Sequence, residues 1–191
     1  AGLLASRFDT LTHPALLVDI GTNGEIALFT GNALLVASSA AGPAFEGARI
    51  RQGMRAIPGA IDQIWMQDGD LRCHVINDAA PCGLCGSALV DVVSVLLQAG
   101  LIDETGLLAP PAAAPQETCR ALHDRLIPFE DAWACVLARD ACGEPLVMLT
   151  QKDIRELQLA AGAIRTGIEV LLARANLTPR DLDALLLAGG F

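Results

Sequence analysis

The stretch Val18-Asp19-Ile20-Gly21-Thr22-Asn23-Gly24-Glu25 decides the expected fold, because it joins two short apolar runs through a glycine-containing turn. The runs, Ala15 to Ile20 and Glu25 to Phe29, each have the length of one strand. The Asn-Gly pair in the turn is a strong hairpin signal, since both residues tolerate positive φ. A third apolar run, Ala33 to Ser38, follows a second turn. The sequence therefore predicts three consecutive strands around this stretch.

The C-terminal part of the chain adds a long helix and a further strand. Thr150 can cap a helix, and Asp153, three residues later, completes an approximate capping box. Apolar residues then recur at spacings of three and four, as on one face of a helix: Ile154, Leu157, Ala161, Ile164, Ile168 and Leu171. Gly162 and Gly167 disfavour a helix, so we expect close packing at both. Ala184 to Ala188 has the composition of a buried strand.

Three strands followed by helix, strand and helix patterns are typical of an α/β fold of the ribonuclease-H type, with a mixed sheet and flanking helices. We treat residues 1–191 as a single fragment, in which about 101–145 form an insertion or loop-rich part. Its Pro/Ala-rich segment, 110–118, is expected at the surface. The remaining expected elements are a long loop with a short helical piece at 40–59, a hairpin across Gln67-Asp68-Gly69-Asp70, a helix over 87–99, and strands over 133–138 and 145–149.

Composition excludes some classes of function. The net charge is −9, and the basic residues form no stripe, so we exclude nucleic-acid binding. No uncharged run of about 18 apolar residues occurs, which argues against a transmembrane helix and a membrane partner. The six cysteines form neither a disulfide framework nor a double CxxC zinc pattern, so we expect reduced thiols and a cytoplasmic location. A start at Ala1 without a signal-peptide pattern indicates a piece of a longer protein.

Asp19 is the candidate catalytic residue. It ends a predicted strand beside a turn whose backbone N–H groups can point outward together, an arrangement that can cradle phosphate. Its carboxylate can hold Mg²⁺ through water or orient an attacking water. From spacing alone, an ordinary hairpin with an exposed acid is the more common interpretation.

Three more loops carry weaker signals. Glycines in Gly189-Gly190-Phe191 allow a ligand to approach the backbone, although a turn without a ligand is more common. Cys82-Gly83-Leu84-Cys85-Gly86-Ser87 precedes a helix whose N-terminus, near Gly86 and Ser87, can face an anion. Its CxxC pair can be a redox couple or half a metal site, but no second CxxC or histidine pair completes one, so we predict no metal ligands. In Gly42-Pro43-Ala44-Phe45-Glu46-Gly47, a binding role and a structural role stay open.

Together these motifs resemble the C-terminal domain of the reductive activators of corrinoid proteins. Their order and spacing agree over nearly the whole chain, and the joint match is more specific than any one motif. The matching pieces are Asp19 to Glu25, Ala40 to Ala48, Cys85 to Ser87, Asp153 to Ala160, Gly162 to Arg165 and Leu187 to Phe191.

The resemblance implies one half, the second, of an actin-like ATPase domain of the sugar kinase, heat-shock ATPase and actin superfamily. In that family ATP with Mg²⁺ binds between two ribonuclease-H-like halves and drives the return of cob(II)alamin to cob(I)alamin on a partner corrinoid protein. Electrons come from an N-terminal domain with a 2Fe–2S cluster, which is absent from this chain. The implied nucleotide-binding residues are Asp19, Gly21, Thr22, Asn23 and Gly24 in the second phosphate turn, Gly189 and Gly190 in the adenosine-side turn, and Gly86 and Ser87 before a helix.

The chain departs from the family pattern in ways that put two turns in doubt. Ala88 stands where glycine is usual, Gly190 stands where alanine is common, and Cys82 is additional. The chain contains one Asp-Ile-Gly-Thr turn, whereas a two-half domain has two. We therefore expect this fragment to fold without ATPase or reductase activity of its own.

Other functions stay open at the level of sequence. A sugar or acid kinase of the same superfamily needs a polar substrate cleft and a second half. A non-catalytic interaction or dimerisation module needs no nucleotide, and a homodimer is compatible with either interpretation. A CxxC metal-binding domain is the third alternative.

Overall fold

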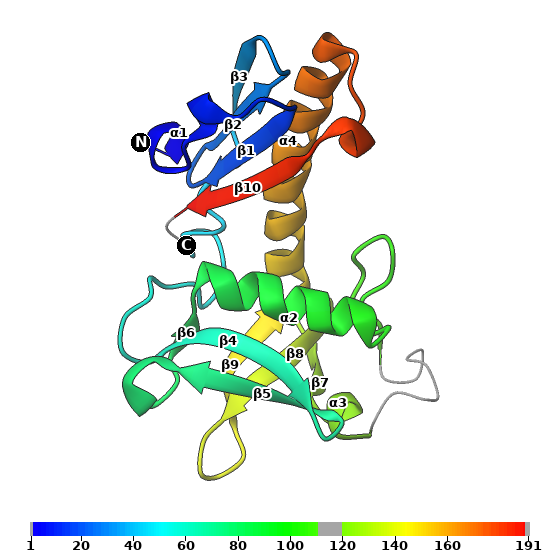
Figure 1. Ribbon diagram of the computed structural model, residues 1–191. Helices are drawn as coiled ribbons and strands as arrows, with labels where there is room; N and C mark the ends of the chain where they lie inside the picture. The colour runs from blue at the N-terminus through cyan, green and yellow to red at the C-terminus, as the bar shows by residue number, and fades with distance from the viewer. Residues whose placement is uncertain (1, 111–119, 190–191) are drawn as a thin grey trace. The chain divides into compact units, whose positions relative to one another are not determined.

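The computed structural model describes residues 2–110 and 120–189 (Figure 1). The strands within these ranges are β1 (Ala15–Ile20), β2 (Gly24–Phe29), β3 (Leu34–Ser39), β4 (Ala60–Gln67), β5 (Asp70–Val75), β6 (Gly83–Leu84), β7 (Leu126–Phe129), β8 (Ala132–Arg139), β9 (Pro145–Thr150) and β10 (Ala184–Gly189). The α-helices are α1 (Gly2–Ala5), α2 (Gly86–Gln98), α3 (Arg120–His123) and α4 (Gln151–Ala175). Short 3₁₀ turns are η1 (Phe8–Thr10), η2 (Ile76–Asp78) and η4 (Pro179–Asp181). None of the helices described here is long and apolar enough to cross a bilayer.

The chain divides into two compact units. Unit 1 is formed by Ala1–Pro43 together with Leu159–Phe191, and unit 2 is formed by Ala44–Gln158. Helix α4 begins in unit 2 and continues into unit 1. The expected insertion, about 101–145, falls inside unit 2. Its Pro/Ala-rich stretch lies mostly outside the described residues.

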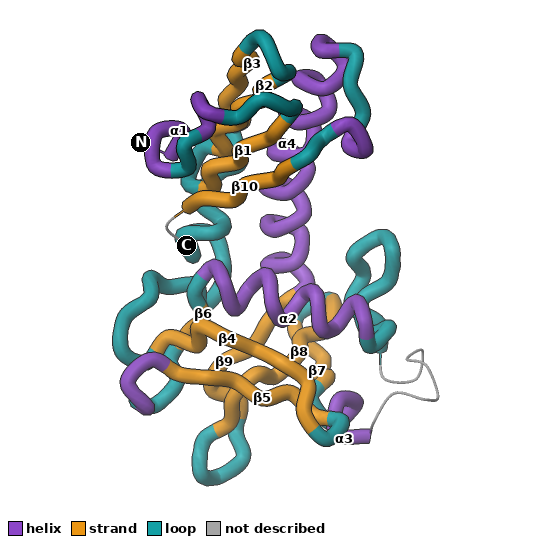
Figure 2. Tube along the Cα trace, in the orientation of Figure 1, coloured by secondary structure: helices purple, strands orange, loops and turns teal. Residues whose placement is uncertain are grey.

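Unit 1 contains one mixed four-stranded sheet, in the order β10-β1-β2-β3 (Figure 2). Strands β1, β2 and β3 form an antiparallel meander, and β10 joins β1 in parallel. This confirms the predicted order of three strands, a helix and a returning strand. The mixed α/β class follows, because a parallel return requires a crossover connection, and α4 lies in that connection.

One face of this sheet packs against the N-terminal segment. Phe8 is 2% exposed and contacts Phe29 edge-on, with ring centroids 6.4 Å apart. The same apolar cluster contains residues of β1, β2 and β10, among them Leu17 and Leu186. Alternation along each strand places these side chains on one face, so the N-terminal segment covers it.

The other face packs against α4. A Cβ at Gly167 would lie 2.5 Å from Cδ1 of Ile26, so the predicted close packing is confirmed there. At Gly162 the prediction is wrong, because no neighbouring segment comes within 4 Å of the position that a Cβ would take. The predicted apolar face also needs one change: Ala160 is buried, whereas Ala161 is exposed. Either alanine fits a spacing of three or four from Leu157 and Ile164, so the pattern alone could not choose between them.

Strand β10 is less buried than its composition suggests. Leu185 and Leu187 are 60% and 68% exposed, whereas Ala184, Leu186 and Ala188 contribute to the core. The prediction of a buried strand is therefore correct for one face and wrong for the other. An apolar run cannot distinguish a central strand from an edge strand, and β10 is at the edge of the described sheet.

Unit 2 holds two three-stranded sheets, β5-β4-β6 and β7-β8-β9, with α2 along β4. The predicted hairpin between β4 and β5 is confirmed: Asp68 and Gly69 have φ of 53° and 78°, the conformation a two-residue turn requires. The predicted helical piece at 40–59 is wrong, since that segment contains only turns, bends and a bridge. Its interspersed Gly and Pro residues interrupt any regular hydrogen-bonding pattern.

Candidate functional site

The predicted phosphate turn is a short connection of three residues between β1 and β2. The N–H of Gly21 donates to the carbonyl of Asn23 at 3.0 Å, and the carbonyl of Thr22 accepts from the N–H of Gly42 at 2.9 Å. Gly42 itself has φ 76°. The loop that begins at Gly42 thus fixes the tip of the turn, which gives this motif a structural role in unit 1.

The expected conformation of this turn is wrong in one respect. Neither Asn23 nor Gly24 has positive φ, and Gly24 is the first residue of β2. Gly24 is instead required by packing: a Cβ there would lie 2.7 Å from Oγ of Ser39 and 2.8 Å from Cγ1 of Ile164. A three-residue connection does not need the two positive φ angles of a two-residue Asn-Gly turn.

Strand β10 brings the second predicted turn next to the first. In the parallel register of β1 and β10, Ile20 is paired with Gly189, and Asp19 with Ala188. Gly189 has φ 151°, a value that favours glycine. Gly189 therefore lies at the same carboxyl edge of the sheet as Gly21. Gly190 lies outside the described residues.

The structure also adds a carboxylate that the sequence pattern did not single out. Asp19 and Glu25 are directly paired across β1 and β2, so both side chains lie on one face of the sheet. Both line a pocket of about 480 Å³ with Leu17, Ala27 and Ser38. Two carboxylates in this position repel each other and attract a cation. Counting outward from a three-residue turn would have revealed this pairing.

Gly86 and Ser87 belong to unit 2, at the start of α2. Cys85 occupies the N-cap, and the Ser87 hydroxyl donates to the carbonyl of Asp62 at 2.7 Å. Gly86 is buried. This turn therefore joins β4 to α2, and the Ser87 hydroxyl is already bound within the chain.

The CxxC pair does not form a metal cluster with its neighbours. Cys82 is exposed and its thiol lies near the sulfur of Met54, at 3.7 Å, whereas Cys85 is buried and contacts the Ser87 hydroxyl at 3.2 Å. Within residues 2–110 and 120–189, no three or more His, Cys, Asp or Glu side chains are grouped as metal ligands. The five cysteines in these ranges are free thiols.

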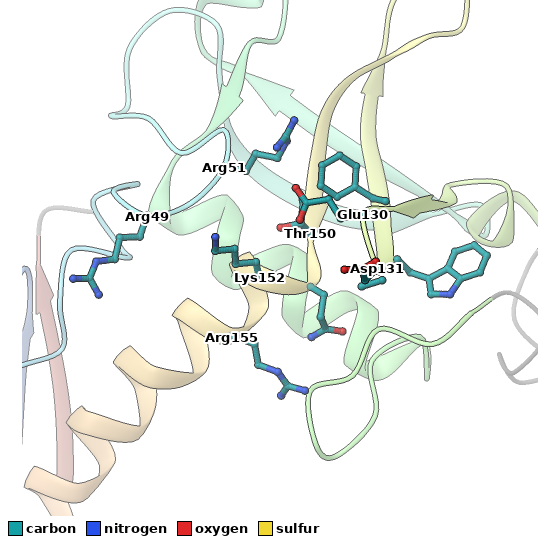
Figure 3. A pocket seen from close by; sticks show the side chains of 11 residues that line it. Arg49, Arg51, Glu130, Asp131, Thr150, Lys152 and Arg155 are labelled. Carbon is teal, nitrogen blue, oxygen red and sulfur yellow. The ribbon is translucent and has the colours of Figure 1, made fainter.

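Unit 2 contains a second pocket, of about 520 Å³, which sequence reasoning missed (Figure 3). Four cationic side chains line it, together with the hairpin between β7 and β8 and the start of α4; the cations are Arg49, Arg51, Lys152 and Arg155. We refer to it as the basic pocket. Three distant parts of the sequence contribute to it, so no local motif reveals it.

Known proteins similar to this chain include activators of corrinoid proteins. Residues 13–191 match the family described as the C-terminal domain of RACo, the ASKHA domain. The corrinoid activation enzyme RamQ of Eubacterium limosum is 35% identical over 176 residues, which is 92% of this chain and 30% of RamQ. The Co(II) methylated amine-specific corrinoid protein reductase of Methanosarcina barkeri is 29% identical over 211 residues, or 99% of this chain and 34% of the reductase.

A solved structure of an activator of a corrinoid protein is also similar to this chain. The reductive activator for corrinoid, iron-sulfur protein superposes with a TM-score of 0.80 at 31% identity, covering 99% of this chain and 29% of the activator. The chain thus spans about a third of the length of the relatives it matches. The family resemblance and the mixed α/β class expected from the sequence are confirmed. This chain belongs to the family of C-terminal ASKHA domains of RACo.

Proposed function

We propose that this chain is part of an ATP-dependent activator that returns cob(II)alamin to cob(I)alamin on a corrinoid protein. Within that activator the chain contributes one side of the nucleotide site. The observation that carries the proposal is the pairing of Ile20 with Gly189, because it sets the Asp19 turn and the Gly189 turn at one edge of one sheet. Ligands of open α/β sheets bind at the carboxyl ends of the strands.

The residues at this edge fit a magnesium nucleotide. Asp19 and Glu25 provide adjacent carboxylates, which suit Mg²⁺ bound through water. The turn from Gly21 to Asn23 is braced by Gly42, so its backbone is fixed before a ligand arrives. Gly189 has no side chain, so an adenine ring or ribose can approach its backbone closely.

Each residue has a distinct proposed task. The 21–23 turn contacts phosphate oxygens through backbone N–H groups other than that of Gly21, which donates to the Asn23 carbonyl, and Asp19 orients water or Mg²⁺ with the help of Glu25. Gly24 supports the turn through packing against Ser39. We also keep three further residues as proposed nucleotide contacts: Gly190, and Gly86 and Ser87 of unit 2. ATP hydrolysis supplies the free energy for an otherwise unfavourable electron transfer.

The proposed reaction adds one electron to the cobalt of cob(II)alamin and gives cob(I)alamin. A 2Fe–2S cluster in another part of the full-length protein is the proposed one-electron donor. The corrinoid protein is the proposed partner, the cytoplasm the proposed location, and a homodimer a compatible assembly. Since the chain spans about a third of its relatives, we propose that it has no ATPase or reductase activity alone.

The test uses the full-length protein that contains this chain. Asp19→Asn should weaken Mg²⁺-dependent ATP binding at least about tenfold, since one charged ligand is worth roughly 1.5–3 kcal/mol. Asp68→Asn, an exposed turn residue in unit 2, is the matched control and should bind ATP normally. Titration with a fluorescent nucleotide, with and without Mg²⁺, measures the nucleotide affinity of both variants. Equal ATP affinity in Asp19→Asn and the control would overturn the proposed nucleotide role and favour the interaction module.

A further inference from the structure

The basic pocket is unusual in this chain because of its charge. Four cations line it against two acids, Glu130 and Asp131, in a protein whose net charge is −9. Its walls come from the segment before β4, the β7–β8 hairpin and the first turns of α4, all within unit 2. A local positive surface on an acidic chain indicates an anionic ligand or partner.

One of the cations, Lys152, lies where helix electrostatics disfavours it. Lys152 and Arg155 project from the first turns of α4, a helix of 25 residues (Figure 3). The N-terminus of a helix carries partial positive charge, so acids stabilise it and bases destabilise it. The buried Asp153 already fulfils the capping role. Stability of the helix therefore does not explain the charge of Lys152.

The cations also lack strong carboxylate partners among the described residues. Arg49 approaches Glu156 at 3.9 Å, with 70% of the Arg49 side chain exposed. Arg51 lies over the ring of Phe129, 4.5 Å from its centre. Arg155 donates to the carbonyl of Thr105 and to a neutral amide, each at 2.6 Å. The lining of the pocket thus keeps a net positive charge.

The exposure of these side chains favours a protein partner over a small anion. Lys152 and Arg155 are exposed, and charges in contact with water are screened, so each contributes little to binding one small ion. The same charges act together when they steer a large partner with an acidic surface. Arginine and aromatic side chains are also the residue types that interfaces prefer, and the pocket combines Arg51 and Arg155 with Phe129 and Trp133.

We infer that the basic pocket docks an acidic segment of the partner corrinoid protein. This inference rests on the proposed function for the identity of the partner. The segment carries two or more Asp or Glu side chains that reach Arg51, Lys152 and Arg155, and an apolar side chain that contacts Phe129 or Trp133. Desolvation on docking strengthens these charge-assisted hydrogen bonds.

The test compares two double variants of the full-length protein with the same change in charge. Lys152→Glu with Arg155→Glu alters the pocket, whereas Arg174→Glu with Arg180→Glu alters exposed positions in unit 1. Binding to the corrinoid protein is followed by biolayer interferometry at low and moderate salt. The pocket variant should lose at least about tenfold in association rate at low salt, and its salt dependence should flatten. The control should change less than about twofold.

Further readouts separate this inference from the proposed function. ATP affinity should be equal in both double variants, and thermal unfolding should show that both variants are folded at the temperature of the binding assay. Equal association rates in the two variants would overturn the docking site. Pyrophosphate binding that depends on Lys152 and Arg155, with unchanged corrinoid-protein binding, would assign the pocket to a small anion and also overturn it. Failure of Asp19→Asn to affect ATP would leave the docking result standing.

Discussion

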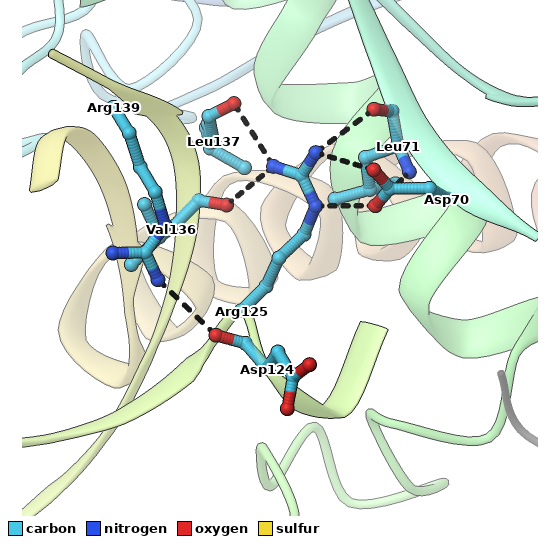
Figure 4. Close-up of polar contacts among 7 residues, drawn as sticks. All are labelled: Asp70, Leu71, Asp124, Arg125, Val136, Leu137 and Arg139. Carbon is cyan, nitrogen blue, oxygen red and sulfur yellow. Dashed lines mark hydrogen bonds and ion pairs between the residues drawn. The ribbon is translucent and has the colours of Figure 1, made fainter. Parts of the chain in front are cut away.

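The guanidinium of Arg125 forms a two-pronged ion pair with the carboxylate of Asp70 (Figure 4). Nε lies 2.5 Å from Oδ1, and a terminal nitrogen lies 2.9 Å from Oδ2. The remaining N–H groups donate to the carbonyls of Leu71, Val136 and Leu137. Arg125 thereby uses all five of its donors and connects the β5-β4-β6 sheet to the β7-β8-β9 sheet.

Replacement of Arg125 should destabilise unit 2 strongly. Arg125→Gln leaves Asp70 without this counter-ion and removes the Arg125 donor from three carbonyls. The side chains are 18% and 25% exposed, so we expect a loss of about 2–4 kcal/mol, slightly below that of a fully buried pair. Arg139→Gln is the control, because Arg139 is exposed and donates to the carbonyls of Gly143 and Asp124. Urea unfolding of both variants measures the difference, and equal midpoints would contradict the connecting role of Arg125.

The same ion pair predicts a dependence of stability on pH. The hydrogen bond from Arg125 lowers the pKa of Asp70 below its ordinary value. The stabilisation that ionised Asp70 gives the folded protein is therefore complete above the pKa of Asp70 in the unfolded chain, roughly 4. This stabilisation is lost as the pH falls through the lower pKa of Asp70 in the folded protein. Hydrogen bonds from threonine side chains also lower the pKa values of Asp103 and Asp181, which act in the same direction. The contribution of Asp70 is the difference in stability between wild type and Asp70→Asn, and this difference should shrink as the pH falls below about 4.

The cap of α4 should contribute more to stability than a cap in solvent. Asp153 is 1% exposed, and its carboxylate accepts from the N–H and hydroxyl of Thr150 and from the N–H of Arg51. Asp153→Ala should cost about 2–4 kcal/mol, because it removes a cap and leaves buried donors unpaired. Asp181→Ala is a matched control in the exposed capping box with Thr178, and it should cost about 0.5–1 kcal/mol. Similar losses of unfolding free energy in the two variants, measured in urea, would show that burial does not increase the contribution of the Asp153 cap.

Two glycines of α4 should respond in opposite ways to alanine. Gly162→Ala meets open space, so higher helix propensity should stabilise the protein by about 1 kcal/mol. Gly167→Ala places a methyl 2.5 Å from Cδ1 of the buried Ile26, and overpacking costs about 1–3 kcal/mol. Gly167→Ala should therefore unfold at lower temperature than Gly162→Ala. The reverse order in calorimetry would refute the close approach of α4 to β2.

Cysteine reactivity should follow burial. Desolvation raises the pKa of the Cys135 thiol to about 12, so almost no thiolate forms at about pH 8. Cys82 and Cys142 are exposed. Iodoacetamide at that pH should label these two in the native protein and spare Cys135, as peptide mass spectrometry can show. Labelling of Cys135 at the same rate would contradict its burial.

Signals carried by neighbouring residues were sufficient to predict several elements. The Thr150–Asp153 box, the Asp68-Gly69 turn and the strands around Asp19 were all correct because their hydrogen bonds join residues close in sequence. The family itself was also identifiable from the spacing of short motifs.

Contacts between segments distant in sequence decided which features of the fold could not be predicted, among them the roles of individual glycines. Sequence could not show that Gly24 serves to admit Ser39 and Ile164, or that Gly162 faces open space whereas Gly167 meets Ile26. A glycine has the same local signature in either role, and only the packed neighbours distinguish them.

By itself, the sequence determined the local elements, the capping of α4 and the family of this chain. Only the tertiary structure paired Ile20 with Gly189, assembled the basic pocket from three separate segments and joined Arg125 to Asp70. The physical reason is that strand pairing, charge clustering and buried ion pairs depend on distances in space. Local propensity fixes which residues form a helix or strand, but packing fixes which of their side chains meet.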